Sequence, residues 1–276
     1  MQLLKRKGVK SMAGGEESGC FSAENGIARH ISVGTHRVLF FSTVDSTSSY
    51  ALRNLETLSD RQVILAETQT KGHGRMRRYW ISSCPQNIYM SMVLKPFPFS
   101  EHLSNLTQYT SAILCDVMDS YGVYAEVKWP NDVLVHGRKI AGILGESSFQ
   151  GDHFQGYVLG AGINLNMNLH DIEMIDQPST ALNLLTGSAV NREDFLRAFL
   201  DRFFYEYELF LQNGFAIIKK VYTARSSILG KPVSVTSSGS LLNGTAADFL
   251  SDGTLVLITD QGEEKVFAAG DVSLRT

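Results

Sequence analysis

The sequence predicts an α+β protein of two folded units, a larger unit of strands and helices followed by a small all-β unit. Three observations support this class. The chain has 276 residues, enough for one substantial core and a small second one. Its first part alternates strand-like apolar segments with segments of helical period. After Ser226 only short strand patterns remain, separated by glycine turns.

The larger unit begins with a strand–helix–strand pattern. Arg37–Ser42 is the first strong strand segment, and residues 45–48 after it are typical of a helix start, because apolar residues then recur at helical spacing. Val63–Thr68 is expected to be a strand that enters a basic, glycine-containing loop. Asn87–Lys95 alternates well enough for a third strand, and Leu103–Tyr121 predicts a helix.

Residues 126–166 contain short β-rich segments separated by glycine turns, which predict an antiparallel meander. These segments are Val133–His136, Lys139–Phe149 and Tyr157–Leu165. A helix is then expected from a cap at Asn191 to a stop at Gly214, with aromatic residues on its buried face. The five strands expected after it favour a small barrel. They are Pro232–Thr236, Leu242–Phe249, Thr254–Thr259, Glu264–Ala268 and Val272–Leu274.

Composition and charge exclude several classes of protein. A formal net charge of −3 and an isoelectric point near 6.2 provide no overall basic field for nucleic-acid backbones. The three cysteines lie in no paired spacing, and the seven histidines lack the spacing of zinc ligands. No apolar run approaches the roughly 18 residues of a membrane-spanning helix. We expect a cytoplasmic protein without zinc that binds neither membrane nor DNA.

Residues 1–36 are expected to form a flexible N-terminal extension. Lysines and an arginine occur early in this segment, but no apolar core of a secretory signal follows them. An organelle transit peptide remains an alternative for it.

The loop Lys71–Arg78 combines two glycines with several cationic side chains. The glycines allow backbone N–H groups to approach a ligand, and the cations can hold phosphate oxygens. A solvated basic hairpin explains the same composition equally well. The loop does not follow the Walker A pattern.

Lys128–Asp132 places a lysine, an amide and a carboxylate around a proline-fixed turn, a set that suits phosphate, Mg²⁺ or general-base chemistry. A strand-initiating turn with a solvated ion pair is the alternative. The hydroxyls of residues 45–48 can cap a helix or bind a polar ligand ring, and Gln69 can serve an amide-like group. Lys139–Gly142 and Gly160–Asn164 offer a lysine, an asparagine and bare backbone where a flat ligand fits.

Taken in order, these motifs closely resemble those of biotin protein ligases, over residues 37–276. The motifs are Asp45-Ser46-Thr47, Glu67-Thr68-Gln69, Gly72-His73-Gly74-Arg75 with Arg78 and Trp80, Lys128–Asp132, Arg138–Gly142 and Gly160–Asn164. The resemblance implies a class II synthetase-like catalytic domain at 37–226, with a mixed or antiparallel sheet flanked by helices. It implies an SH3-like barrel at 227–276, whose end at 270–275 is also similar to the family.

The resemblance further implies a role for each motif residue. The biotin-binding set would be Ser46, Thr47, Gln69, Gly72, His73, Lys139, Gly142, Gly160 and Gly162. The ATP-binding set would be Arg75, Arg78, Trp80, Asn131 and Asn164. The catalytic set would be Arg75, Lys128, Asp132 and Lys139, with Asp132 as the base that helps deprotonate the incoming lysine. Mg²⁺ would arrive with ATP, near Asn131 or Asp132, with no metal bound by protein alone.

The implied activity is the ATP-dependent attachment of biotin, through biotinyl-5′-AMP, to a lysine of a biotin carboxyl carrier domain. A lipoate-type ligase is the alternative substrate class. A ligase that doubles as a repressor is disfavoured, because residues before Arg37 are too few for a winged helix. The sequence is consistent with a monomer or a homodimer. Two positions depart from the family pattern, since His73 replaces an arginine and Arg77 replaces a glycine.

Overall fold

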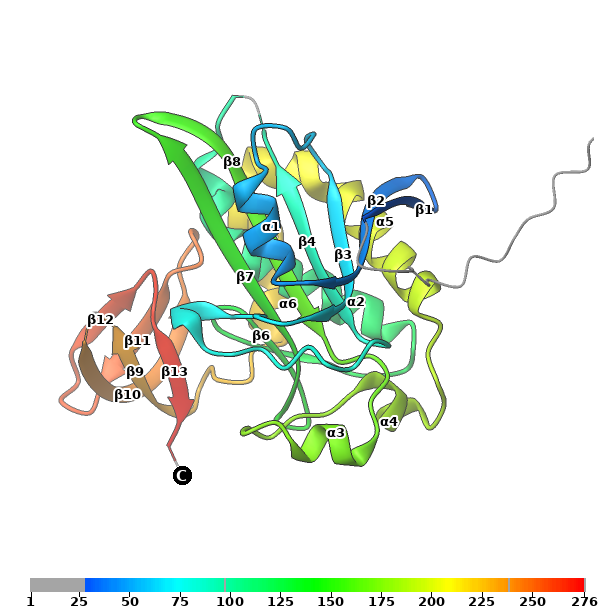
Figure 1. Ribbon diagram of the computed structural model, residues 1–276. Helices are drawn as coiled ribbons and strands as arrows, with labels where there is room; N and C mark the ends of the chain where they lie inside the picture. Colours follow the sequence, from blue (N-terminus) through cyan, green and yellow to red (C-terminus); the bar gives the residue numbers. More distant parts are fainter. Residues whose placement is uncertain (1–27, 97, 238, 276) are drawn as a thin grey trace, which may run out of the picture.

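The computed structural model describes residues 28–96, 98–237 and 239–275 (Figure 1). These residues form an eight-stranded mixed sheet and a five-stranded antiparallel sheet. Helices flank the larger sheet, and the smaller sheet lies at the C-terminal end of the chain (Figure 1). The predicted α+β class is therefore confirmed. None of the helices in the described part is long and apolar enough to cross a membrane.

The eight strands lie in the order β1-β2-β3-β4-β8-β7-β6-β5. Only β2 and β3 are parallel, because α1 (Thr47–Arg53) crosses between them, and every other neighbouring pair is antiparallel. The strands are β1 (Arg29–Val33), β2 (His36–Val44), β3 (Val63–Gln69), β4 (Ile88–Leu94), β5 (Glu126–Lys128), β6 (Asp132–Val135), β7 (Arg138–Gln150) and β8 (His153–Ile163).

The sheet starts earlier than the sequence analysis placed it. β1 lies inside the segment assigned to an N-terminal extension, and it pairs with the first half of β2 through a turn at Gly34. The strand was missed because only Ile31 and Val33 carry its apolar alternation and most of its side chains are exposed. Residues 1–27 of the predicted extension lie outside the described residues.

The two faces of the large sheet carry separate buried clusters. α1 packs on one face against side chains such as Ile64, Val93 and Val158. The other face carries the larger core, formed with α2 (Leu106–Asp119) and α5 (Arg192–Asn213). The cap predicted for α5 is confirmed, because the Asn191 side chain accepts the N–H groups of Glu193 and Asp194. The remaining helical segments are Arg75–Arg77, Glu101–Asn105, Leu169–Glu173 (α3), Leu182–Thr186 (α4), Gly214–Ile217 and Lys219–Ala224 (α6).

The C-terminal sheet has the order β12-β11-β10-β9-β13, and each strand predicted after Ser226 overlaps one of its members. Gly253, at the β10–β11 turn, attaches this sheet to the rest of the chain. Its carbonyl accepts hydrogen bonds from the Gln108 amide (2.9 Å) and the Trp129 indole (3.2 Å). The strands are β9 (Pro232–Ser237), β10 (Ser240–Phe249), β11 (Leu255–Thr259), β12 (Glu264–Phe267) and β13 (Asp271–Leu274).

Candidate active site

One pocket collects almost every residue that the sequence analysis singled out. It lies where the start of α1, the loop after β3, the β5–β6 turn, and strands β7 and β8 meet. Asp271 and Val272 of β13 also line it, so the C-terminal sheet contributes to the site. The predicted residues in its wall are Ser46, Thr47, Gln69, His73, Arg75, Arg78, Trp80, Lys128, Asn131, Asp132, Lys139, Gly142, Gly160 and Gly162.

Gly72 and Asn164 do not line this pocket. Gly72 packs behind it, because a side chain there would lie 2.5 Å from the Ser82 hydroxyl and 2.7 Å from the Trp80 carbonyl. Asn164 is buried in an adjoining pocket that shares Trp80 and Lys139 with the first. The Asn164 amide donates to the Thr180 carbonyl at 3.1 Å, which fixes its orientation there.

Hydroxyl and amide groups form a connected network at one end of the pocket. Gln69 Oε1 accepts the Thr47 N–H at 2.8 Å, and Gln69 Nε2 donates to the Ser82 hydroxyl at 2.9 Å. The Ser91 hydroxyl joins the network from β4, with 2.8 Å to the Thr47 hydroxyl and 2.9 Å to that of Ser48. Sequence reasoning missed Ser82 and Ser91. The available signal was a single serine inside the apolar strand β4, where an unpaired hydroxyl is costly.

Ser46 and Asp45 hold the start of α1 against the pocket. The Ser46 hydroxyl accepts the Ser49 N–H at 3.4 Å, so the capping interpretation is correct, and the same residue lines the pocket. Asp45 accepts two hydrogen bonds from Arg53, at 2.7 and 3.0 Å, and one from the Ser46 N–H at 2.8 Å. These contacts, chiefly the Arg53 bonds, lower the pKa of Asp45 below its ordinary 3.8.

We therefore expect Asp45→Asn to destabilise the protein at neutral pH by up to about 1 kcal/mol, the usual limit for an exposed ion pair. A carboxyl whose pKa is lower in the folded state stabilises the fold above its unfolded pKa, and this contribution is lost as the pH falls through the folded pKa. Urea denaturation of both proteins at pH 7 and at successively lower pH checks this. A gap between variant and wild type that stays constant down to acid unfolding contradicts it.

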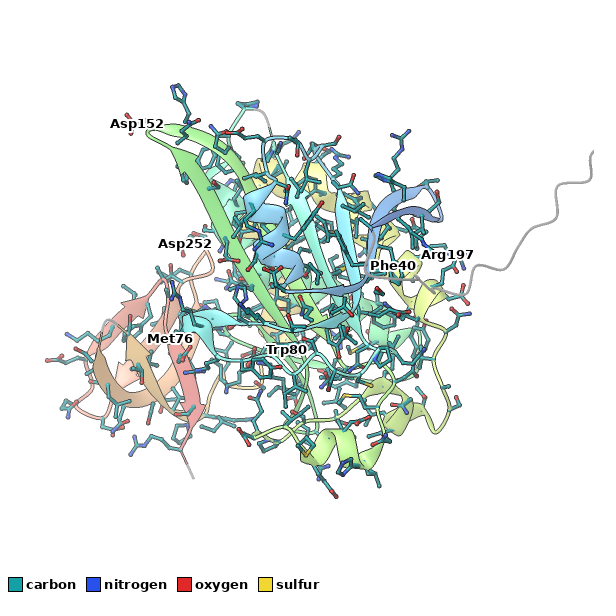
Figure 2. All side chains as sticks on the ribbon, in the orientation of Figure 1. Phe40, Met76, Trp80, Asp152, Arg197 and Asp252 are labelled. Atoms are coloured by element: carbon teal, nitrogen blue, oxygen red, sulfur yellow. The ribbon has the colours of Figure 1, made fainter. Side chains whose placement is uncertain are left out.

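Trp80, labelled in Figure 2, forms a flat wall against two strands that lack side chains at the contact. A Cβ added to Gly162 would lie 2.3 Å from the indole, and one added to Gly142 would lie 2.8 Å from it. The indole therefore rests directly on the backbone of β7 and β8. Its N–H is buried and has no hydrogen-bond partner among the described residues, which leaves a donor available to a ligand.

Lys139 and Asp132 form an ion pair in the pocket, with Nζ 2.8 Å from the carboxylate. Both side chains are largely buried, at 16% and 20% exposure, so solvent screens them little. The Lys139 ammonium also lies 5.3 Å from the centre of the Trp80 ring. Backbone bonds to Pro178 and Thr180 fix the lysine at the start of β7. A cation is thus held at a defined point beside a carboxylate.

The loop after β3 brings two arginines to the same pocket. Arg75 donates to the Asn131 side chain at 3.2 Å and to the Gly270 carbonyl at 3.0 Å, and lies 3.4 Å from the Asp271 carboxylate. Arg78 forms an ion pair with the other oxygen of Asp271. Of the two interpretations of this loop, the solvated hairpin does not describe Arg75, whose side chain is 26% exposed.

Met76 and Arg77, between these arginines, adopt the left-handed backbone region, with φ of 54° and 56°. This conformation costs a non-glycine residue roughly 1–2 kcal/mol. Arg77 is the position where the family resemblance calls for glycine, and a glycine there would avoid the cost. His73 is tied back to its own loop, with Nδ1 3.3 Å from the Lys71 carbonyl.

Sequence comparison places these features in a known family. Residues 40–164 match the biotin/lipoate A/B protein ligase family, and residues 228–275 match the biotin protein ligase C terminal domain. A biotin--[acetyl-CoA-carboxylase] ligase of Paracoccus denitrificans is 31% identical over 230 residues, which covers 82% of this chain and 95% of that protein. The chain belongs to the biotin protein ligase family. The predicted family and its ligase class are thereby confirmed.

Other members of the biotin protein ligase family extend the comparison. The bifunctional ligase/repressor BirA of Bacillus subtilis is 28% identical over 214 residues, 77% of this chain and 66% of that protein, so this chain spans slightly under two thirds of its length. The biotin protein ligase of Aquifex aeolicus, solved in complex with biotin and ATP, is 26% identical. It superposes with a TM-score of 0.73 over 86% of this chain and 98% of that one.

The described ranges contain no group of three or more histidine, cysteine, aspartate or glutamate side chains arranged to bind an ion. Asn131 and Asp132 do offer oxygen atoms beside the arginines, which suits an ion that keeps nucleotide oxygens among its ligands.

Proposed function

We propose that this chain activates biotin with Mg-ATP to biotinyl-5′-AMP and then transfers biotin to a lysine of a biotin carboxyl carrier domain. The observation that carries the proposal is the position of Lys139. This largely buried cation lies in one pocket with two arginines and with the hydroxyl and amide network of Thr47 and Gln69. The network suits the ureido ring of biotin, and the cations suit a carboxylate and phosphates.

The first step joins the biotin carboxylate to the α-phosphate and releases pyrophosphate. Negative charge grows on the phosphate oxygens as the bond forms, and preorganised donors in a partly dry site stabilise it strongly. Lys139 and Arg75 are the donors that this chain supplies, and Lys128 lines the same wall. Asn131 or Asp132 would offer an oxygen to the Mg²⁺ that accompanies ATP, and this ion would neutralise part of the same charge.

The second step needs an uncharged amine, whereas a free lysine has a pKa near 10.4. Asp132 is the base proposed for this proton. In the structure its carboxylate is paired with Lys139 Nζ at 2.8 Å. Once Lys139 engages the adenylate, Asp132 is left beside the activated carbonyl with a lone pair to accept the proton. The amine then attacks that carbonyl, and AMP leaves.

Mass spectrometry of a purified biotin carboxyl carrier domain, incubated with the protein, biotin and Mg-ATP, tests the proposal. We expect a single biotinyl addition that requires ATP. A carrier domain whose acceptor lysine is replaced by arginine is the matched control and should stay unmodified. An unmodified wild-type carrier domain, with the protein folded and biotin present, rejects the proposal.

A lipoate-type ligase is the second candidate, because residues 40–164 match a family description that covers both substrates. ATP–pyrophosphate exchange with biotin or with lipoate as the acid separates the two. We expect exchange with biotin alone. Since some relatives are bifunctional ligase/repressors, a gel shift on the biotin-operon promoter at physiological salt tests the expectation of no DNA binding.

A further inference from the structure

One carboxylate of the C-terminal sheet contacts both arginines of the loop after β3. Asp271, the first residue of β13, lies 3.4 Å from Arg75 and forms an ion pair with Arg78 through its other oxygen. In Figure 1 this loop, drawn in cyan, lies against β13, drawn in red. Both arginines and Asp271 line the pocket that holds Lys139. Asp271 is therefore a second carboxylate, besides Asp132, in a pocket whose arginines and lysines suit anions.

We propose that the Asp271 carboxylate pairs with the guanidinium groups of Arg75 and Arg78 at the position where the nucleotide phosphates bind. Asp271 is displaced from them when ATP binds. The inference rests on the proposed function, since it assigns the arginines to phosphate. A carboxylate and a phosphate oxygen are alternative partners for one guanidinium, because both accept the same planar pair of N–H groups. Binding of the triphosphate must either break the contacts between Asp271 and the arginines or overcome the repulsion between the phosphates and the Asp271 carboxylate.

Arg75 keeps two neutral partners when Asp271 is displaced. The Asn131 side chain and the Gly270 carbonyl both accept from Arg75 Nη1, at 3.2 and 3.0 Å. These bonds hold its guanidinium toward the pocket without neutralising its charge. Arg78 is different, because its side chain is 70% exposed and Asp271 restrains it from the C-terminal sheet. Displacement of Asp271 thus frees Arg78 and leaves Arg75 oriented.

The backbone between the arginines fits this arrangement. Met76 and Arg77 are held in the left-handed region while the residues on either side of them are tied to the same carboxylate. Release of Asp271 removes that tie, so the loop can relax toward ordinary backbone angles as the nucleotide enters. Asp271 accordingly competes with phosphate for the two arginines, and the C-terminal sheet lowers the affinity of the site for ATP.

The test uses Asp271→Asn, which keeps the shape of the side chain and removes its charge. Calorimetric titration with inorganic tripolyphosphate should give a dissociation constant about fivefold lower than wild type, the upper range for an exposed ion pair. At saturating biotin, the KM for Mg-ATP in pyrophosphate release should fall by a similar factor. Asp260→Asn is the matched control, since Asp260, in the turn after β11, pairs with Arg275, directly after β13, at 2.7 Å and does not line the pocket. It should change neither value.

Each outcome decides the inference. Unchanged or weaker tripolyphosphate binding in Asp271→Asn overturns it, as does the absence of binding to both proteins. A lower kcat with no fall in KM also overturns it, because that result makes Asp271 a positioning residue for Arg75. The titration needs no turnover, so it separates this inference from the proposed function, which fails if wild type releases no pyrophosphate from ATP and biotin. Thermal melts of both variants verify folding.

Discussion

Lys139→Met is expected to slow biotinyl-adenylate formation by about 10²- to 10³-fold, the usual effect of removing one well-placed donor from a developing oxyanion. Methionine keeps an unbranched side chain of nearly the same length but lacks the ammonium that lies over the Trp80 ring, so the change is mainly the loss of charge. Single-turnover pyrophosphate release at saturating biotin and Mg-ATP measures the effect. The surface variant Lys265→Met, which breaks an exposed pair with Glu263, is the control for removal of a lysine.

The pair with Asp132 makes a second variant necessary. Lys139→Met leaves a largely buried carboxylate without its partner, which can destabilise the site independently of catalysis. Adding Asp132→Asn removes that charge and restores electrostatic balance. If the double variant recovers stability but adenylates as slowly as Lys139→Met, while Asp132→Asn alone adenylates faster, Lys139 acts on the chemistry. Adenylation near the wild-type rate in a folded Lys139→Met protein would remove the lysine from the mechanism.

Gly162→Ala is expected to weaken biotin binding by about 5- to 150-fold, which corresponds to an overpacking cost of about 1–3 kcal/mol. The new methyl group would lie 2.3 Å from the Trp80 indole, a distance that no Cβ contact tolerates. Trp80 must then leave the backbone of β7 and β8, and the wall of the pocket moves with it. Equilibrium binding of biotin and chemical denaturation measure the two effects.

Two further variants isolate the cause. Gly74→Ala introduces the same methyl group into the same pocket, where the nearest atom would lie 3.9 Å away, so the fold should tolerate it. Trp80→Ala removes the clashing ring. If the contact explains the cost, Gly162→Ala destabilises the wild-type protein but adds little in the Trp80→Ala background. Additive effects of the two changes would point to another origin.

Most strands and the membership of the pocket were predictable because their signals are local. Periodicity located β2, β3, β4, β6, β7 and β8, and short motifs located Gln69, Asp132 and Lys139. The weaker signals were lost where a strand is short or polar, as in β1 and β5. Ser91 escaped notice because its partners lie on α1, more than forty positions away.

The contacts of the arginine loop were beyond sequence reasoning for a different reason. Asp271 follows Arg78 by 193 positions, and no pattern near either residue pairs them. The left-handed backbone at Met76 and Arg77 was equally hidden, because nothing in these residue types favours it. The departure from glycine at Arg77 was visible in the sequence, but its meaning required the backbone angle.

The attachment at Gly253 has a consequence for how the molecule melts. Trp129 lies in the β5–β6 connection, next to Asn131 and Asp132. Its buried indole N–H donates a hydrogen bond to the Gly253 carbonyl in the β10–β11 turn. The Gln108 side-chain amide of α2 donates a hydrogen bond to the same carbonyl. If the small sheet unfolded, the buried N–H groups of Trp129 and Gln108 would lose their hydrogen-bond acceptor inside the large core. The two sheets are thus thermodynamically linked, and heat should unfold them in one cooperative transition.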